Sequence, residues 1–218
     1  MFTKGNLKPV LEARGLACRR GSEWLFDDLS FEIFPGQIVW LQGQNGRGKT
    51  SLLRLIVGLA APDRGTLKWG GSATQESTVE QGKLVYIGHT NGLKDDLTVT
   101  ESLKFLARLH GRDSSDESVL NALEMLQMSH RKNALVRTLS QGQRRRVALA
   151  RLALERNPSI WVLDEPFDAL DAQGISVVNR LLVEHVQRGG CVFLTSHLHL
   201  SLDGSQYRTL DFQKGMVS

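Results

Sequence analysis

The chain has few of the features that mark secreted, metal-binding or membrane-spanning proteins. Its 218 residues include only two cysteines, Cys18 and Cys191, and no Cys-x-x-Cys or Cys/His metal spacing. We therefore expect no disulfide framework, no zinc motif and a reducing cytosolic setting. Apolar runs such as residues 160–163 and 191–194 are far shorter than the roughly 20 residues that a membrane-spanning helix needs. Residues 1–11 also lack the apolar segment of a secretory signal.

The overall composition is that of an ordinary soluble globular chain, with 41% hydrophobic and 23% charged residues. The 27 Lys and Arg residues outnumber the 23 Asp and Glu residues, which gives a net charge of +4. This excess is too small to demand nucleic acid, so no nucleic-acid partner is expected. At about 150 residues per domain, the length suggests one core with an added lobe.

Strand-like and helix-like segments alternate along the chain, which is typical of a largely parallel sheet flanked by helices. Leu29, Phe31 and Ile33 alternate with polar residues, as in a half-buried strand. Further strands are expected at residues 37–41, 83–87, 160–163 and 191–195. A helix is expected between the strands at residues 37–41 and 83–87. Its apolar side comprises Leu52, Leu53, Leu55, Ile56 and Leu59. The pattern predicts an α/β fold in a single domain over residues 1–218.

Between residues 89 and 157 the pattern becomes helical. Thr98 and Glu101 have the spacing of a capping box, which begins a helix that carries Leu103, Phe105, Leu106 and Leu109. Two more helices are expected over residues 116–128 and 141–156, and Asn157-Pro158 stops the second of them. We therefore expect residues 89–157 to form a helical lobe inserted into the α/β core.

A glycine-rich segment has the pattern of a phosphate-binding loop. Residues 43–50 match G-x-x-x-x-G-K-S/T and lie between an apolar strand and an apolar-faced helix, as such a loop requires. Glycines let backbone N–H groups approach phosphate oxygens, and the helix presents its positive end to the anion. Lys49 is expected to reach the β- and γ-phosphates, and Thr50 is expected to ligate Mg²⁺. The residues predicted to bind nucleotide here are Gly43, Gln44, Asn45, Gly46, Arg47, Gly48, Lys49, Thr50 and Ser51.

Two carboxylates, Asp164 and Glu165, follow the apolar strand at residues 160–163. In an open α/β sheet, a carboxylate at the carboxyl end of a strand lies beside the phosphate loop. We expect Asp164 to hold Mg²⁺ through water. Glu165 is one residue further on, so it points elsewhere and is expected to polarise an attacking water as the catalytic base.

Three further motifs identify a family. Residues 139–143, Leu-Ser-Gln-Gly-Gln, resemble the LSGGQ signature of the ABC-transporter ATPases. Residues 168–171 resemble the D-loop of that family, and residues 195–197 resemble its switch-histidine segment. The motifs stand in the order of the family from about residue 11 to residue 200. The resemblance implies an ATPase with a P-loop NTPase core of ABC type, with ATP and Mg²⁺ as its cofactors.

The resemblance also implies a partner chain. In this family two nucleotide-binding domains, identical or homologous, meet head to tail, and each ATP lies between the phosphate loop of one chain and the signature of the other. On that model Ser140, Gly142 and Gln143 contact ATP bound to the partner. A hydroxyl at a helix N-terminus is chemically suited to such an anion contact. His197 would hold the γ-phosphate and the catalytic water.

The chain departs from the family pattern at three positions. The third signature residue is Gln141 rather than glycine. Arg20 stands where the family has an aromatic residue that stacks on adenine, so either the Arg20 guanidinium or Trp24 would contact the base. His89 stands where the family has the Q-loop glutamine, and a neutral imidazole there could accept a hydrogen bond from a Mg²⁺-bound water.

Within the family, the segments around His89, residues 164–171 and residues 184–190 look like those of the haem exporter ATPases of cytochrome c maturation. That likeness implies a separate integral membrane subunit and a peripheral place on the cytoplasmic face of the inner membrane. Three alternatives are an ABC transporter ATPase for another cargo, a soluble ABC ATPase not coupled to transport, and a non-catalytic nucleotide switch. Nothing in the sequence is a recognisable haem site, so the cargo rests on resemblance alone.

Overall fold

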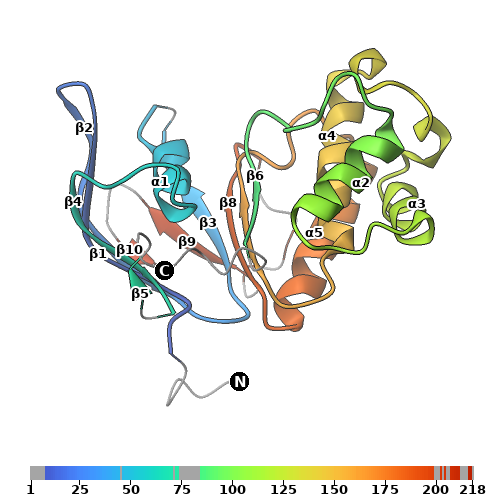
Figure 1. The fold of residues 1–218 in the computed structure, drawn as a ribbon. Coiled ribbons are helices and arrows are strands. Elements are labelled where there is room, and N and C mark those ends of the chain that lie inside the picture. The colour runs from blue at the N-terminus through green and yellow to red at the C-terminus, as the bar shows by residue number, and fades with distance from the viewer. Residues whose placement is uncertain are drawn as a thin grey trace.

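The computed structural model describes residues 8–44, 46–70, 72–73, 84–198, 202, 204, 207–211 and 216–217. Two sheets and a group of helices form the protein (Figure 1). An antiparallel sheet lies at one end of the molecule, helices α2 to α5 lie at the other, and a mostly parallel sheet runs between them. The four helices are α2 (Val99–Leu109), α3 (Asp116–Met125), α4 (Gln141–Ala150) and α5 (Ala172–Gln187).

The central sheet has the strand order β10-β9-β3-β8-β7-β6. All neighbours pair in parallel except β9 and β10, which are antiparallel. Four of the five strands expected from the sequence are found here within a residue of the expected positions, as far as those residues are described. The strands are β3 (Ile38–Gln42), β6 (Leu84–Ile87), β7 (Ile160–Leu163), β8 (Cys191–Thr195), β9 (Arg208–Asp211) and β10 (Met216–Val217).

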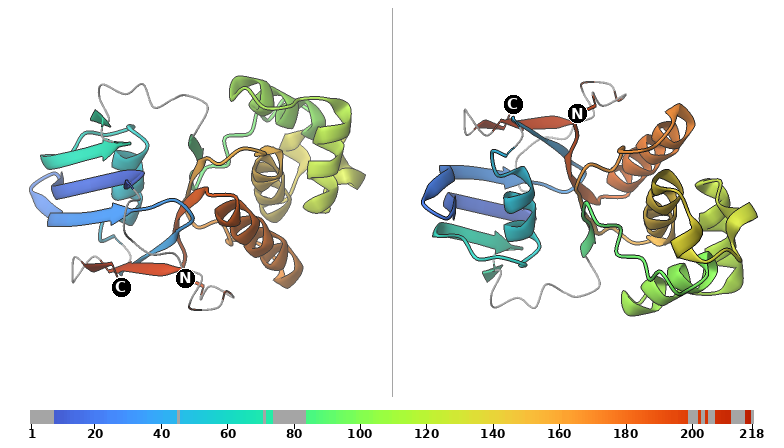
Figure 2. Two further views of the ribbon diagram at one scale, coloured as in Figure 1. Left: turned by 90° about the horizontal axis from the view of Figure 1, so that it is seen from below. Right: turned by 90° about the horizontal axis from the view of Figure 1, so that it is seen from above.

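The antiparallel sheet, with the order β2-β1-β4-β5, was only partly expected. The predicted strand at residues 29–33 is the second half of β2 (Glu23–Ile33). The remaining strands are β1 (Leu11–Arg20), β4 (Arg64–Trp69) and β5 (Ser72–Ala73). Helix α1 (Lys49–Ile56) lies beside this sheet and away from α2 to α5 (Figure 2).

Two expectations about helices were wrong in detail. Leu59 lies beyond the end of α1 and is 66% exposed, because the chain turns at Gly58 with φ 74°. Helix α2 carries the apolar residues expected of it, and two of them, Phe105 and Leu109, are 42% and 65% exposed. The helices expected to run to residues 128 and 156 end earlier: α3 ends at Met125, and α4 ends at Ala150 and continues as a 3₁₀ turn, Arg151–Leu154. The capping box of Thr98 and Glu101 at the start of α2 is confirmed.

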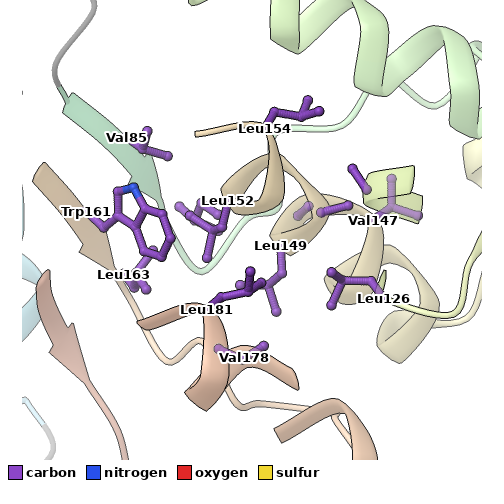
Figure 3. Close-up of a cluster of buried hydrophobic side chains, with 14 of the residues drawn as sticks. Val85, Leu126, Val147, Leu149, Leu152, Leu154, Trp161, Leu163, Val178 and Leu181 are labelled. Atoms are coloured by element: carbon purple, nitrogen blue, oxygen red, sulfur yellow. The ribbon is translucent and has the colours of Figure 1, made fainter. Parts of the chain in front are cut away.

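Each parallel strand divides its side chains between two cores. Trp161 and Leu163 of β7 face the helices, whereas Val162 faces α1 and the antiparallel sheet. Figure 3 shows the helical side, where Trp161 and Leu163 lie near apolar side chains of the helices, such as Leu149 and Leu181. Burial on both faces explains why these strands are continuous apolar runs rather than alternating ones.

Helices α2, α3 and α4 all come from the segment between β6 and β7 (Figure 1). The proposed boundaries of the inserted lobe, residues 89–157, stay a prediction. The parallel pairing has one consequence for function. Because β3, β6, β7 and β8 run in the same direction, the segments that follow them meet at one edge of the sheet.

Candidate nucleotide-binding site

The segments after these four strands line a cavity of about 420 Å³. The start of α1 contributes Lys49 and Thr50 from the segment after β3, and the segment after β7 contributes Asp164 and Glu165. His89 follows β6 and His197 follows β8, so residues far apart in sequence meet here. The remaining lining residues are Arg20, Leu25, Gly46, Gly48, Ser51 and Asp168.

The glycine-rich loop is held in a conformation that requires glycine. Gly48 has φ 94° and precedes α1 directly, and a Cβ there would lie 2.9 Å from Leu25 Cβ. Lys49 is 9% exposed, and its ammonium donates to the Gly43 carbonyl across the loop at 2.9 Å. A buried cation with one neutral acceptor is electrostatically ready for an anion.

Asp164 lines the cavity, and its carboxylate accepts hydrogen bonds from two hydroxyl groups. Its carboxylate accepts from the Thr50 hydroxyl at 3.0 Å and from the Thr195 hydroxyl at 2.8 Å, and its side chain is almost fully buried. Thr195 in turn accepts from the Glu165 backbone N–H at 2.9 Å. Thr195 therefore ties the carboxyl ends of β7 and β8 together and orients both acidic residues.

Glu165 and His197 form a second pair. The His197 backbone N–H donates to Glu165 Oε2 at 2.9 Å, and the His197 imidazole Nε2 lies 3.3 Å from Glu165 Oε1. Glu165 is 8% exposed and has φ 49°, a left-handed conformation that is uncommon outside glycine. The two carboxylates have different partners, since Asp164 accepts from Thr50 and Thr195, whereas Glu165 accepts from the His197 backbone.

The signature residues lie outside this cavity. Ser140 is the N-cap of α4, and it forms a capping box with Gln143 in which each side chain accepts from the backbone N–H of the other. Gly142 packs against the D-loop, since a Cβ there would lie 2.6 Å from the Ala169 carbonyl oxygen. None of the three is among the residues that line the cavity in the described part of the chain. The structure therefore does not bring the signature to the phosphate loop of its own chain.

The two candidates for base contact occupy different environments. Arg20 lines the cavity together with Leu25. Trp24 instead contacts two guanidinium groups, those of Arg19 at 4.7 Å and Arg64 at 4.8 Å from the ring centroid. Arg19 is paired with Trp24 across β1 and β2, whereas Arg20 is paired with Glu23, so the two candidates lie on opposite faces of this hairpin. Of the two candidates, Arg20 lines the cavity, and Trp24 is not among its lining residues.

Three other residues of the predicted phosphate loop, Gly43, Gln44 and Arg47, make contacts within the loop and are not among the residues that line the cavity. Gly43 contributes its carbonyl to Lys49, while the Gln44 carbonyl accepts from the Arg47 backbone N–H. Asn45 lies outside the described residues.

Sequence reasoning missed Arg145, which is 4% exposed and donates to the backbone carbonyls of both Asp164 and Glu165. Burial lowers the pKa of the Arg145 guanidinium, and the carboxylates of Asp168, Asp164 and Glu165 oppose that shift. Tyr86 was also missed, and burial, followed by the nearby Asp164 charge, raises its pKa.

The site can be compared with known proteins. A family model described as ABC transporter matches residues 26–168. The chain belongs to the ABC transporter family. It is 42% identical over 202 residues to the cytochrome c biogenesis ATP-binding export protein CcmA of Vibrio vulnificus, and the match covers 92% of this chain and 98% of that relative.

Solved structures of ABC ATP-binding subunits share the fold. One, an ATP-binding subunit of an ABC transporter, matches with a TM-score of 0.82 and 25% identity, over 95% of this chain and 88% of that one. A dimeric ATP-binding cassette bound to ADP and Pi after hydrolysis matches with a TM-score of 0.78 and 23% identity, over 95% and 96% of the two chains. This member of the ABC transporter family is an ATPase with a P-loop core. Within the described ranges, every helix is too short or too polar to traverse a bilayer.

Proposed function

We propose that this ABC ATPase hydrolyses ATP as a head-to-tail dimer and drives an export step in cytochrome c biogenesis, with haem as the cargo. The observation that carries the catalytic part is the pair formed by Glu165 and His197 beside the cavity that also holds Lys49. The export step rests on the relatives, which are named as cytochrome c biogenesis export proteins.

The cavity fits the phosphates of a nucleotide. Its volume of about 420 Å³ falls in the range of small-molecule sites, which is roughly 300–1,000 Å³. Lys49 and the N-terminal backbone of α1 supply positive charge, and the glycine conformations leave room for phosphate oxygens close to the chain. On this proposal Gly46, Gly48, Lys49, Thr50 and Ser51 hold the phosphates, and Arg20 lies against the base.

The donors beside the phosphates suit Mg²⁺. Thr50 and Asp164 offer two hard oxygens that already lie 3.0 Å apart. Among the described residues no cluster of three or more His, Cys, Asp or Glu could hold a metal alone. This agrees with Mg²⁺, which is usually bound through one or two protein oxygens together with phosphates and waters. When bound, Mg²⁺ would neutralise charge on the phosphates, and Thr50 and Asp164 would hold it, with His89 near its waters.

Glu165 is placed to act as the base for water. Its carboxylate is nearly buried and fixed at one oxygen by the His197 backbone N–H, which leaves the second oxygen near the His197 imidazole. A water between this carboxylate and the terminal phosphate would give up a proton to Glu165 as it attacks phosphorus. As the bond from water to phosphorus forms, the bond from phosphorus to the bridging oxygen would break and ADP would leave. His197 would orient the water and donate to an oxygen of the transferred phosphoryl group.

A second chain completes the site in this proposal. The N-terminus of α4, with Ser140 as its cap, is not part of the cavity lining in the described portion of its own chain. Ser140, Gly142 and Gln143 would contact ATP bound to the partner, whose own signature would contact ATP bound here. The dimeric form of a structurally similar cassette supports this arrangement at the level of fold.

The membrane side of the proposal needs a second protein. An integral membrane subunit on a separate chain would carry the cargo, and this chain would bind it peripherally at the cytoplasmic face of the inner membrane. Nothing in the described residues favours one cargo chemically, so the choice of haem depends on the kinship with the cytochrome c biogenesis relatives.

The test is to purify the tagged chain from gently solubilised membranes of its own cell. We expect a co-purifying integral membrane protein, and we expect ATPase activity that depends on Mg²⁺. Deleting the gene should abolish covalent haem in c-type cytochromes, and the Glu165→Gln gene should not restore it. Normal c-type cytochromes in the deletion strain would contradict the export role and favour an ABC transporter for another cargo.

A further inference from the structure

Arg145 makes an unusual set of contacts for an arginine inside a helix. Its Nη2 donates to the carbonyl oxygens of Asp164 at 2.6 Å and Glu165 at 2.7 Å. Its Nη1 donates to the Gly88 carbonyl at 3.0 Å and to Asn91 Oδ1 at 2.9 Å. One guanidinium therefore joins helix α4 to the segments that follow β6 and β7.

These acceptors lie where the β-ladder ends. Strands β6 and β7 pair from Leu84 to Ile87, and the Asp164 N–H still donates to Ile87 as the last bond of the ladder. Beyond this point neither segment continues as a strand, and the pairing of β6 with β7 ends. Arg145 replaces the missing ladder with a planar fork of donors, a geometry that lysine cannot reproduce because its donors share one nitrogen.

These contacts of Arg145 are not those of a residue whose main role is to stabilise the fold. Arg145 is 4% exposed, all four of its acceptors are neutral oxygens, and its Nε has no partner among the described residues. A buried charge with incomplete pairing contributes little net stability, since an apolar side chain of similar volume would avoid the cost of desolvation. What the contacts do fix are the two peptide groups on either side of Glu165, which has a left-handed φ of 49°.

We infer that Arg145 is a positioning residue that links the two ATP sites of the dimer. This inference rests on the proposed head-to-tail arrangement. The same helix carries Ser140 at its N-terminus, which would face ATP bound to the partner, and Arg145 five residues later, which holds the backbone of Glu165. Capture of the partner's ATP by α4 therefore sets the base of this chain's own site. The loop that carries His89 is held in register by the Gly88 and Asn91 contacts.

The main test is Arg145→Lys, which keeps the charge and removes the fork. The per-site affinity for a fluorescent ATP analogue should stay within about twofold, because no contact of Arg145 reaches the phosphate loop. The kcat should fall by roughly 10–100-fold, since small misplacement of a reacting group has effects of that size. The Hill coefficient for ATP should fall from above one to about one. A purely structural role would change the melting temperature and the active fraction but would leave the Hill coefficient unchanged.

The matched control is Arg144→Lys, the same exchange at the next residue of α4. Arg144 donates to Asp95 at 2.7 Å in a pair that is 30% and 58% exposed, so its loss should change neither kcat nor the Hill coefficient. Wild-type kcat and cooperativity in Arg145→Lys would overturn the inference alone. A wild-type chain that lacks ATPase activity would overturn the proposed function and this inference together.

A second variant covers the case in which Arg145→Lys does not fold. Asn91→Ala removes one acceptor on the partly exposed side of the bridge and leaves the arginine in place. It should lower kcat roughly 2–10-fold, the size of one lost hydrogen bond, with reduced cooperativity and unchanged affinity. Where both single variants fold, the fall in kcat of the Arg145→Lys/Asn91→Ala double variant should be smaller than the product of the falls in the two single variants. Wild-type kcat and Hill coefficient in Asn91→Ala would overturn the inference.

Discussion

Replacement of Glu165 by glutamine should separate ATP binding from ATP hydrolysis. Glu165 accepts the His197 N–H through Oε2 at 2.9 Å, and a glutamine carbonyl oxygen can accept the same bond. The exchange also preserves the volume of a side chain that is only 8% exposed. The backbone contacts to Thr195 and Arg145 do not involve the carboxylate. The fold and the phosphate loop should therefore stay intact.

What the exchange removes is the proton acceptor. Loss of a positioned general base costs roughly 10²–10⁴-fold in rate. At 1.36 kcal/mol per tenfold change, this corresponds to about 2.7–5.4 kcal/mol in the activation free energy. Binding of ATP depends on Lys49 and the α1 N-terminus, so it should change little. The variant should therefore accumulate as an ATP-bound dimer.

The assay compares kcat at saturating ATP and Mg²⁺ with the affinity for a fluorescent ATP analogue and with the elution volume in the presence of ATP. The control is Glu184→Gln, the same exchange at an exposed position of α5. This control should match wild type in all three measurements. Turnover by Glu165→Gln within a few-fold of wild type would refute the assignment of the base.

Four further outcomes are expected. Lys49→Ala should weaken nucleotide binding roughly 10–150-fold, because a charged hydrogen bond to phosphate contributes about 1.5–3 kcal/mol; unchanged binding of a fluorescent analogue would remove Lys49 from the site. Mixed Ser140→Arg and Lys49→Ala chains should form an ATP-dependent dimer that neither forms alone, since only the mixture holds one intact composite site; its absence on size exclusion would count against the head-to-tail model. Arg20→Tyr should increase the ratio of kcat/KM for ATP over GTP, because a guanidinium stacks on any base and can donate to guanine O6 and N7, whereas an unchanged ratio would separate Arg20 from the base. Burial lowers the pKa of His185 from 6.5 to about 4, so the unfolded state binds a proton at a higher pH than the folded state does, and the free energy of unfolding should fall as the pH drops from 6.5 to about 4. His185→Phe should make this fall smaller, and urea midpoints that decrease equally with pH in both proteins would contradict it.

Much of the nucleotide site could be predicted because each motif is local. The phosphate loop and the carboxylates after β7 depend on short segments whose chemistry is nearly independent of the remaining chain, and the same holds for the helix caps at Thr98 and Ser140 outside the cavity. The structure adds the long-range contacts of these segments. The sequence predicted only that Thr50 and Asp164 lie beside the same phosphates, whereas the structure shows a direct 3.0 Å bond between these residues, which are 114 positions apart.

The antiparallel sheet was harder to predict because β1 does not keep a period of two. Leu11 and Ala13 alternate with polar residues, but Leu16, Ala17 and Cys18 are consecutive and all buried. The register against β2 shifts between Ala13 and Leu16 and again before Cys18, and Gly15 lies in between with φ 57°. A bulge of this kind inserts a residue and reverses the facing of those after it, so the strand shows no continuous alternation in sequence.

Arg145 shows a different reason why the sequence was not sufficient. It lies between Arg144 and Arg146 in a run of three identical residues, yet Arg144 pairs with Asp95 near the surface and Arg146 pairs with Asp171 of the D-loop. The helical period does not distinguish them, because α4 is also buried at every position from Val147 to Ala150 and so has no single apolar side. The burial of Arg145 follows from unpaired carbonyls created elsewhere, where β6 and β7 separate, since buried backbone oxygens need a donor from some part of the chain. That requirement exists only after the sheet has formed, and it brings the middle arginine to the backbone of Asp164 and Glu165 although no motif marks it.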